Sequence, residues 1–266
     1  MSMKAVVFDW AGTMVDYGCF APLAVFLQVF KKRGIELTAA EAREPMGMLK
    51  RDHIQALCKM ERVAALWHER YGRLPNEADV DELYADFEPM LMATLHEYAT
   101  PVPGAMELVG RLREQGIKIG STTGYTREMM NVVAASAKQQ GYEPDVLITP
   151  SEVPAGRPYP WMCYQNAILL DVYPMNEIVK VGDTTSDMRE GRNAGMWTVG
   201  VLKGGSELGL SLEEVTSMPQ EELDKKLAIA TERLMAAGAH YVIEEIGCLD
   251  EVLKKIEMRH AEGERP

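Results

Sequence analysis

Short apolar runs alternate along this chain with stretches of helical periodicity. The runs with strand character are residues 4–8, 117–121, 146–148, 178–181, 197–201 and 241–246. Apolar residues at helical spacing lie between them, as in Leu108, Val109 and Leu112, whose helix ends at Gly116. Strands that alternate with amphipathic helices are typical of a parallel sheet covered by helices on both faces. The pattern therefore predicts an open α/β sandwich.

One interval breaks this alternation. Residues 19–99 have helical periodicity and contain no convincing strand. Within them, Thr38 and Glu41 are typical of a capping box at the start of a helix. Pro45 should end that helix, so that residues 46–50 begin a new element. The interval is therefore predicted to be an all-helical insert.

The position of the insert, directly after the first strand, bears on function. Ligands of open α/β sheets bind beyond the carboxyl ends of the strands, so an insert at this point is placed to cover a site. We therefore predict a helical cap domain of residues 19–99 on an α/β core domain of residues 1–18 and 100–266. Residues 206–238 are expected to form solvated amphipathic helix, and the sequence does not indicate the role of residues 206–266.

Composition limits the partners of this protein. The 28 basic and 40 acidic residues give a net charge of −12, which opposes non-specific binding to nucleic acid or to anionic membrane surfaces. No apolar run approaches the roughly 18 residues that span a bilayer. The four cysteines include no CxxC pair, and the N-terminus has no signal-peptide pattern. We therefore expect a soluble, reduced, cytoplasmic protein.

Two of the predicted strands end in a carboxylate. Asp9 follows the first strand and is itself followed by a tight-turn Gly and Thr, while Asp183 follows the strand of residues 178–181. On neighbouring parallel strands, these acids would place oxygen ligands around one Mg²⁺. Taken alone, Asp9 is equally compatible with a turn or a helix cap. Asp187 either completes the metal site or is a helix N-terminal charge favoured by the helix dipole.

Two further segments contain groups that bind phosphoryl oxygens. Thr123 lies in a hydroxyl-rich strand end, and Arg157 is a lone cation in a loop rich in Pro and Gly. Either segment alone is more often a turn than a site. In the order Asp9, Thr123, Arg157 and Asp183, on four successive strand ends, they resemble the four motifs of the haloacid dehalogenase superfamily. That resemblance implies a Rossmann-like parallel-sheet core and an aspartyl-phosphate formed on Asp9.

Two departures from that pattern narrow the range of reactions that the site could catalyse. Phosphatases of the superfamily carry a second Asp two positions after the nucleophile, which protonates the leaving oxygen, but Ala11 stands there. Arg157 likewise replaces the more usual Lys. An apolar residue at position 11 suits a carbon leaving group, which needs an electron sink more than immediate protonation. A lysine that forms a protonated imine with an aldehyde two bonds from phosphorus would supply that sink.

The insert contains four candidate amines, Lys31, Lys32, Lys50 and Lys59. Lys31 and Lys32 lie at a helix C-terminus, where the dipole favours cations, and are expected at the surface. Lys50 follows an apolar segment and has His53 one turn further along the helix. An apolar pocket would depress the pKa of the Lys50 amine, and His53 could act as a base. A lone helical lysine is more often solvated, so that alternative stays open.

A closer match is to the phosphonatase family, the phosphonoacetaldehyde hydrolases. The segments that carry this resemblance are residues 8–22, 46–50, 124–127, 154–161 and 182–184. It covers most of the chain and weakens after about Gly205. Met14 stands where a second threonine is expected, and we expect its side chain to support packing. The resemblance implies hydrolysis of the C–P bond of phosphonoacetaldehyde to acetaldehyde and phosphate, through an imine on Lys50 and a phosphorylated Asp9.

The resemblance also implies roles for individual residues. The Mg²⁺ ligands would be Asp9, Asp183 and the backbone carbonyl of Ala11, with Asp187 in the outer shell. Thr123 and Arg157 would hold the phosphoryl group. The residues that would line or tune the site around Lys50 are His53, Cys19, Met46, Gly124 and Tyr125. A homodimer is implied as well, but the sequence does not indicate its interface.

Two other functions compete with this one. A capped phosphomonoesterase of the same superfamily, acting on a small phosphate ester, would share the fold, but Ala11 argues against it. A non-catalytic phosphate-binding protein would have no use for both Asp9 and Asp183, because paired acids without a metal repel each other. The sequence does not indicate the pathway, the kinetic constants, or whether Asp187 binds the metal directly or through water.

Overall fold

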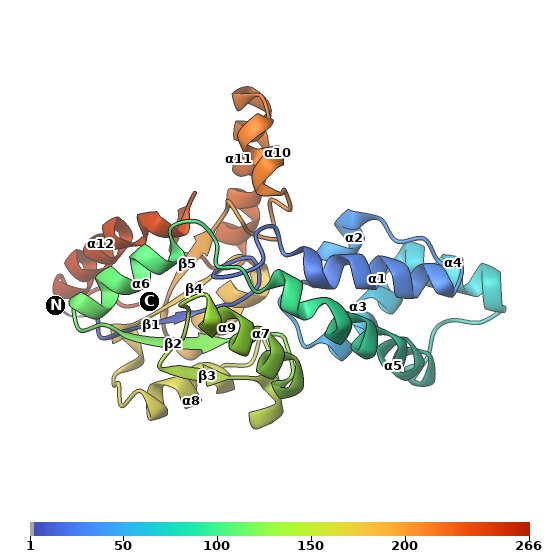
Figure 1. Ribbon diagram of the computed structural model, residues 1–266, viewed down its shortest axis with the longest axis horizontal. Helices are drawn as coiled ribbons and strands as arrows, with labels where there is room; N and C mark the ends of the chain where they lie inside the picture. Colours follow the sequence, from blue (N-terminus) through green and yellow to red (C-terminus); the bar gives the residue numbers. More distant parts are fainter. Residues whose placement is uncertain (1–2) are drawn as a thin grey trace.

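A six-stranded parallel sheet forms the centre of the larger lobe of this protein (Figure 1). The computed structural model describes residues 3–266. The strands are β1 (Ala5–Phe8), β2 (Lys118–Thr122), β3 (Val146–Ile148), β4 (Ile178–Gly182), β5 (Trp197–Val201) and β6 (Tyr241–Ile243). Their order is β3-β2-β1-β4-β5-β6, so β1 lies between β2 and β4. Phe8 pairs with Ser121 on one side and with Val181 on the other, which brings three strand ends to one edge of the sheet.

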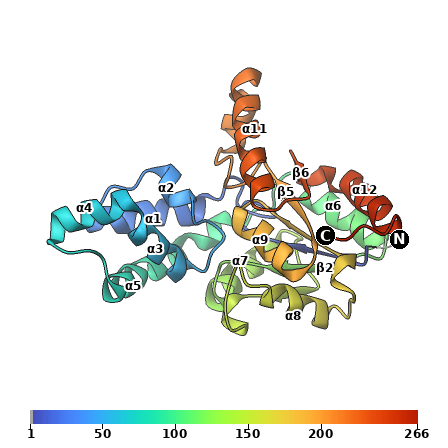
Figure 2. The same ribbon diagram turned by 180° about the vertical axis from the view of Figure 1, so that it is seen from behind.

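Helices cover both faces of this sheet. The helices of this lobe are α6 (Ala105–Glu114), α7 (Arg127–Gln139), α8 (Trp161–Leu169), α9 (Thr185–Ala194), α10 (Leu212–Ser217), α11 (Gln220–Ala236) and α12 (Leu249–Ala261). Val6 and Phe8 share an apolar cluster with residues of α6, α7 and α12. Ala5 and Val7 share another with residues of α8 and α9, which lie in front of the sheet in Figure 2. The alternation along β1 therefore buries the strand on both sides, as expected for a parallel sheet.

The second lobe is helical and is built from the segment between β1 and α6. It consists of α1 (Phe20–Lys32), α2 (Ala39–Arg43), α3 (Lys50–Lys59), α4 (Glu61–Tyr71), α5 (Glu77–Thr94) and the short helix η1 (Leu95–Tyr98). The capping box at the start of α2 is present, because the Thr38 side chain accepts a hydrogen bond from the Glu41 amide at 3.1 Å and Glu41 accepts one from the Thr38 amide at 2.8 Å. The predicted α/β fold with a helical insert is confirmed.

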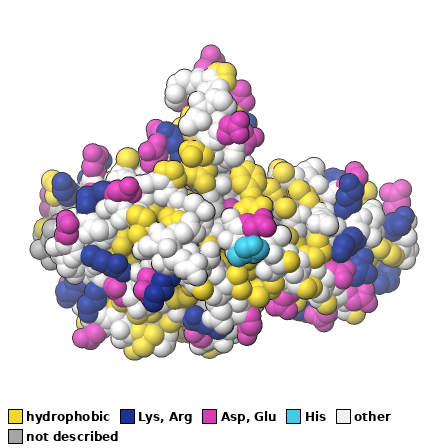
Figure 3. Space-filling model, viewed as in Figure 1, with side chains coloured by type: hydrophobic (Ala, Val, Ile, Leu, Met, Phe, Trp, Pro, Cys, Tyr) yellow, Lys and Arg dark blue, Asp and Glu magenta, His cyan; other side chains and the backbone are white. Residues whose placement is uncertain are grey.

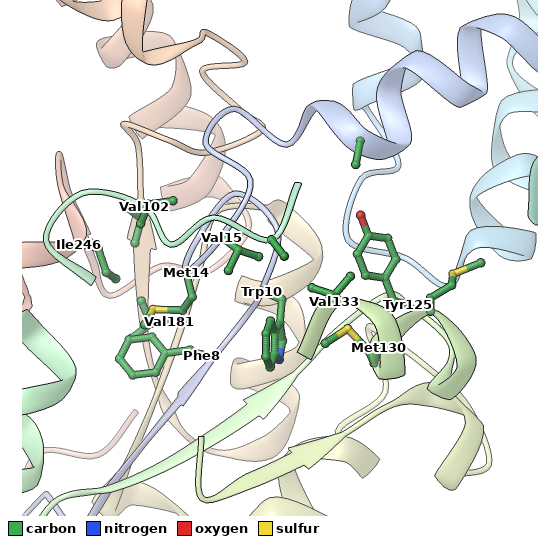
Figure 4. Close-up of a cluster of buried hydrophobic side chains, with 14 of the residues drawn as sticks. Phe8, Trp10, Met14, Val15, Val102, Tyr125, Met130, Val133, Val181 and Ile246 are labelled. Atoms are coloured by element: carbon green, nitrogen blue, oxygen red, sulfur yellow. The ribbon is translucent and has the colours of Figure 1, made fainter. Parts of the chain in front are cut away.

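Two chain segments join the lobes and lie side by side. These crossing segments are residues 9–19, before α1, and residues 99–104, before α6. The Asp16 amide donates to the Thr100 carbonyl at 3.3 Å, and the Val102 amide donates to the Met14 carbonyl at 2.9 Å. Met14 is fully buried in an apolar cluster with Phe8, Val15 and Val181 (Figure 4). The side chain at position 14 therefore packs beneath the crossing segments, as expected.

The sixth predicted strand was too long. β6 ends at Ile243, and a 3-10 turn, η4 (Ile246–Cys248), follows it. Glu244 and Glu245 are exposed and both pair with Lys203, so the chain leaves the sheet where its charged side chains meet solvent. Ile246 is buried again and gives the segment its strand-like apolar pattern. The other five predicted strands agree with the structure to within one residue.

Residues 206–238 form two helices and a loop. Pro219 separates α10 from α11, which together project from the larger lobe (Figure 1). Charged side chains of both signs are spread over the visible surface of both lobes and of this projection (Figure 3). Within residues 3–266, none of the helices combines the length and the apolar character that a membrane crossing requires.

Candidate active site

Three acids meet at the edge of the sheet where β1 and β4 end. Asp9, Asp183 and Asp187 are buried, and each offers a carboxylate oxygen within 4.8 Å of the others. Asp183 is fixed by the Thr13 hydroxyl, which donates to it at 3.0 Å, and by the Ser206 amide at 2.7 Å. The turn after β1 needs Gly12, because φ is +90° there and a Cβ would lie 2.4 Å from an Asp183 oxygen.

Asp187 lies both in this acidic cluster and at the N-terminus of a helix. It is the third residue of α9 and forms a capping box with Thr184, whose hydroxyl donates to Oδ2 of Asp187 at 2.6 Å. Its Oδ1 accepts a hydrogen bond from the Lys180 ammonium at 2.6 Å. Both oxygens therefore have donors within the protein, which suits a residue that orients the acidic cluster from outside.

Arg157 links this cluster to the neighbouring elements. Its guanidinium donates to Oδ1 of Asp9 and to the Thr122 hydroxyl, both at 2.7 Å, and to Glu190 at 2.9 Å. It also donates to the Gly47 carbonyl of the helical lobe at 3.3 Å. Burial alone would lower the pKa of Arg157, but the surrounding carboxylates raise it well above its usual value. The guanidinium therefore stays charged and is held beside Asp9.

Lys180 and Glu190 belong to the same buried network, and sequence reasoning did not single them out. Lys180 lies on β4 and its ammonium is 3.6 Å from Glu190, while Gly191 leaves room for the lysine because a Cβ there would lie 2.8 Å from the Lys180 Cβ. A lysine inside the apolar strand Ile-Val-Lys-Val was a usable signal, because a buried amine needs an acidic partner.

The buried charges of this network do not balance. Within residues 3–266, the ion pairs of the four carboxylates Asp9, Asp183, Asp187 and Glu190 come from two cations, Arg157 and Lys180, so two negative charges of the cluster have no ion-pair partner. Burial and the neighbouring acids raise the pKa of Asp183 well above its usual value, and burial is the main cause of the raised pKa of Asp9. An all-oxygen cluster with this excess is consistent with a divalent metal site.

Lys50 reaches the same site from the helical lobe. It is the first residue of α3 and is only 3% exposed, and its ammonium lies 4.8 Å from the centroid of the Tyr125 ring. Burial lowers the pKa of Lys50, with a further lowering from Arg157, while Cys19 and Asp9 oppose the change. A larger share of the amine is therefore neutral than for a lysine in water. The alternative of a solvated lysine is excluded.

One small cavity between the lobes collects these side chains, with at most about 260 Å³ of empty space. Its lining consists of Asp9, Ala11, Cys19, Met46, Gly47, Lys50, Thr123, Gly124, Tyr125, Arg157 and Thr184. Nine of the residues that the sequence suggested are therefore brought together here, and Gly47 and Thr184 are additions.

Three suggested residues do not line the cavity. Asp183 and Asp187 belong to the acidic cluster with Asp9. The third is His53. It is fully buried, and its ring stacks on Phe26 with centroids 3.9 Å apart. Nε2 of His53 lies 2.9 Å from the Ala42 carbonyl, and Nδ1 has no hydrogen-bond partner within residues 3–266. Burial and then the charge of Lys50 lower the pKa of His53 well below its usual value, so the ring is neutral.

Known proteins resemble this chain over nearly its whole length. A family model of haloacid dehalogenase-like hydrolases matches residues 3–195. The phosphonoacetaldehyde hydrolase of Bacillus cytotoxicus is 61% identical, with 97% of each chain covered. A bifunctional phosphonoacetaldehyde hydrolase/aminoethylphosphonate transaminase of Clostridioides difficile is 60% identical over 96% of this chain, which spans 40% of that longer protein.

The solved structures agree with the sequences. The crystal structure of a phosphonoacetaldehyde hydrolase-like protein from Oleispira antarctica superposes with a TM-score of 0.96 at 40% identity, covering 100% of this chain and 96% of that one. The similarity therefore includes the parallel-sheet lobe and the helical insert together. This chain belongs to the phosphonoacetaldehyde hydrolase family of the haloacid dehalogenase-like hydrolases.

Proposed function

We propose that this protein hydrolyses the C–P bond of phosphonoacetaldehyde to acetaldehyde and phosphate. The observation that carries the proposal is that a buried amine, Lys50, and a strand-end carboxylate, Asp9, line one small cavity from opposite lobes. An amine and a carboxylate nucleophile are the two groups that this reaction requires. The names of the relatives that cover this chain nearly end to end support the same substrate.

Mg²⁺ is the proposed cofactor. Asp9, Asp183 and the backbone carbonyl of Ala11 would hold it, and Asp187 would orient these ligands from outside. When bound, it supplies positive charge beside the phosphoryl oxygens. Arg157 supplies the second positive charge and, with Thr123, would orient the phosphoryl group toward Asp9.

Lys50 is the proposed electron sink. Its neutral amine attacks the aldehyde carbon and releases water, forming a protonated imine two bonds from phosphorus. Asp9 then attacks phosphorus, the C–P bond breaks, and its electron pair moves to the imine to give an enamine. Water hydrolyses the phosphorylated Asp9 to phosphate, and protonation and hydrolysis of the enamine release acetaldehyde and restore Lys50. We assign two proton transfers to the ring of His53: it takes a proton from the Lys50 ammonium, which frees the amine, and returns that proton to the departing water as the protonated imine forms.

The remaining cavity residues have supporting roles in this proposal. Ala11 places no acid beside the leaving group, which suits carbon rather than oxygen. Cys19, Met46, Gly124 and Tyr125 would enclose the aldehyde end and exclude water from the imine. This assigns catalysis to a core of residues 1–18 and 100–266, and the amine to a cap of residues 19–99.

Borohydride trapping tests the function. With phosphonoacetaldehyde and Mg²⁺, the protein should release equal amounts of acetaldehyde and phosphate, and reduction during turnover should leave a two-carbon adduct on Lys50. Lys59, at the exposed end of the same helix, is the internal control and should stay unmodified. Product formation without an adduct would exclude the imine. Rapid cleavage of phosphate monoesters that survives Lys50→Ala would favour a phosphomonoesterase instead.

A homodimer is also part of the proposal. Large apolar side chains are exposed together on and beside α8, with Ile168 69%, Leu169 56% and Tyr173 83% exposed. Contiguous apolar surface of this kind marks interaction sites. Sedimentation of Ile168→Asp should show a monomer. Ile229→Asp, at a position 61% exposed on α11, is the matched control and should leave the dimer intact.

A further inference from the structure

Arg43 reaches from the helical lobe to the sheet lobe. It is the last residue of α2, and one guanidinium nitrogen donates to the Gly18 carbonyl at 2.8 Å and to the Ser206 hydroxyl at 3.3 Å. The other terminal nitrogen donates to the Gly209 carbonyl at 3.4 Å. The guanidinium carbon lies 5.1 Å from the centroid of the Phe20 ring. One side chain thus connects α2, the crossing segment before α1 and the loop after β5.

The loop that Arg43 contacts also holds an acid of the active site. The backbone amide of Ser206 donates to Asp183 at 2.7 Å, and a Cβ at Gly205 would lie 2.8 Å from the Asp183 Cβ. The same loop is bonded to the crossing segment, because the Gly18 amide donates to the Gly204 carbonyl at 2.6 Å. A group fixed to this loop is therefore fixed relative to Asp183.

On its other side, Arg43 is coupled to Lys50. His53 of α3 is hydrogen-bonded to the carbonyl of Ala42, the neighbour of Arg43 in α2, at 2.9 Å. Only residues 44–49 separate Arg43 from Lys50, and Met46 and Gly47 of that stretch line the cavity. Fixing the end of α2 therefore also fixes the start of α3, where Lys50 lies.

The surroundings of Arg43 favour a cation at this position. A Cβ at Gly209 would lie 2.8 Å from Nε of Arg43, so the guanidinium lies flat on the loop. The charge of Arg43 acts on the buried carboxylate of Asp16, which accepts hydrogen bonds from the first amides of α1, and on Glu207. The planar guanidinium presents its donors in a fixed fork that spans three separate acceptors, whereas the ammonium of a lysine is a compact point charge.

We propose that Arg43 is a positioning residue that fastens the helical lobe to the loop of residues 203–209 and so keeps Lys50 over Asp9. The purpose of this contact rests on the proposed function, but the contact itself is testable without substrate. Loss of the contact should let the lobes separate more often and expose the cavity.

The four cysteines provide the test. Cys19 lines the cavity and is 3% exposed, Cys58 is buried within the helical lobe, Cys163 is buried under the sheet, and Cys248 is exposed. A thiol reagent labels each cysteine at its own rate. The rate at Cys19 reports on opening of the lobes, the rates at Cys58 and Cys163 report on unfolding of the helical and sheet lobes, and the rate at Cys248 checks the reagent. In Arg43→Met, labelling of Cys19 should accelerate about tenfold or more, because hydrogen bonds from a charged donor are lost. Labelling of Cys58 and Cys163 should stay unchanged.

Two further variants sharpen the result. Arg43→Lys should give an intermediate acceleration at Cys19. Arg62→Met removes an arginine that pairs with Glu41 inside the helical lobe, and it should leave Cys19 protected. Unchanged Cys19 labelling in Arg43→Met, or an equal rise at Cys19, Cys58 and Cys163, would overturn the proposal.

Steady-state kinetics separate this proposal from the function itself. In Arg43→Met, kcat/KM should fall while the borohydride adduct, once formed, still lies on Lys50. A wild-type protein that does not cleave phosphonoacetaldehyde, yet shows Arg43-dependent protection of Cys19, would refute the function and support the contact. A wild-type protein that cleaves phosphonoacetaldehyde, but whose Cys19 is labelled as fast as that of Arg43→Met, would refute the contact alone.

Discussion

Arg157 is held by acceptors from four parts of the chain. Asp9 follows β1, Thr122 ends β2, Glu190 lies on α9, and the Gly47 carbonyl belongs to the helical lobe. A guanidinium has five donors in a fixed plane, so it can satisfy all of these acceptors, whereas an ammonium would leave some unpaired. Arg157 therefore connects Asp9 with the helical lobe as well as neutralising charge.

Glu190 is predicted to orient Arg157. Glu190→Ala leaves Nε of Arg157 and the ammonium of Lys180 short of a buried partner, so it should lower the free energy of unfolding by about 3–5 kcal/mol. Glu190→Gln keeps an acceptor for Nε and should lose less stability, with a higher KM. Chemical denaturation and steady-state kinetics measure both effects.

The matched control for this prediction is Glu232→Gln, at an exposed position within α11. It should change neither stability nor KM. Equal stability of Glu190→Ala and the wild type would show that Glu190 does not hold the guanidinium.

Single residues were predictable from the sequence where their position in an element was diagnostic. Asp9 and Asp183 follow strands, and Arg157 is a cation in a loop rich in Pro and Gly. Their order along the chain made all three candidates, although each segment alone was also typical of a turn. Lys180 and Glu190 were not recognised, because a helical glutamate is normally solvated and the two pair only across β4 and α9. Contacts between separate elements do not appear in a linear pattern.

At the scale of elements, the two lobes meet through backbone as well as side chains. Gly124, after β2, lies against the segment before α3, and a Cβ at Gly124 would lie 2.5 Å from the Met48 carbonyl and 2.8 Å from the Gly47 carbonyl. Backbone atoms cannot rotate away as a side chain can. The absence of a side chain at position 124 therefore lets the cap approach the core.

Gly124→Ala is predicted to keep the lobes apart. The φ of Gly124 is not in the left-handed region, so the substitution should leave the fold stable while it displaces Lys50 from Asp9. A displacement of about 1 Å can cost a hundredfold in rate, so kcat/KM should fall by about that factor. Gly110→Ala, in α6 with no atom within 4 Å of the added Cβ, is the control and should raise stability slightly. Full activity of Gly124→Ala would contradict the contact.

Elements were predictable where burial and periodicity coincide. β3 and β5 were placed exactly as observed because apolar runs and strand bounds agree there. The predicted strand of residues 241–246 was too long, because Ile246 is buried in a turn after the strand has ended. The apolar pattern does not distinguish burial in a strand from burial in such a turn. The helical character of residues 20–98 followed from their pattern, but the packing of α2 against the sheet lobe through Arg43 did not.

At the scale of the whole molecule, folding of the sheet lobe buries an excess of negative charge. The acidic cluster brings two uncompensated charges together in a protein whose net charge is already −12. Burial and mutual repulsion raise the pKa of Asp9 and Asp183, so without metal the folded state binds protons that the unfolded state has released. Metal-free stability should therefore fall as pH rises above the ordinary range of an aspartate, because the folded state then gives up those protons.

Mg²⁺ is predicted to oppose this fall of stability with rising pH. Because the metal and the protons compete for the same carboxylates, the increase in melting temperature that Mg²⁺ produces should be larger at about pH 8 than at about pH 6. A concentration about 100 times the dissociation constant contributes ~2.7 kcal/mol. Thermal unfolding with Mg²⁺ and with a chelator at both pH values measures the difference.

Asp183→Asn provides the decisive comparison for the metal. It removes one of the excess charges, so the variant should be more stable than the wild type in the presence of chelator and should lose most of the response to Mg²⁺. Asp171→Asn, outside the cluster in the loop after α8, should behave as the wild type does. A response to Mg²⁺ that is equal at both pH values, or that survives Asp183→Asn, would show that the cation binds elsewhere. The charge excess of the cluster would then need another explanation, since Arg157 and Lys180 balance only two of its four carboxylates.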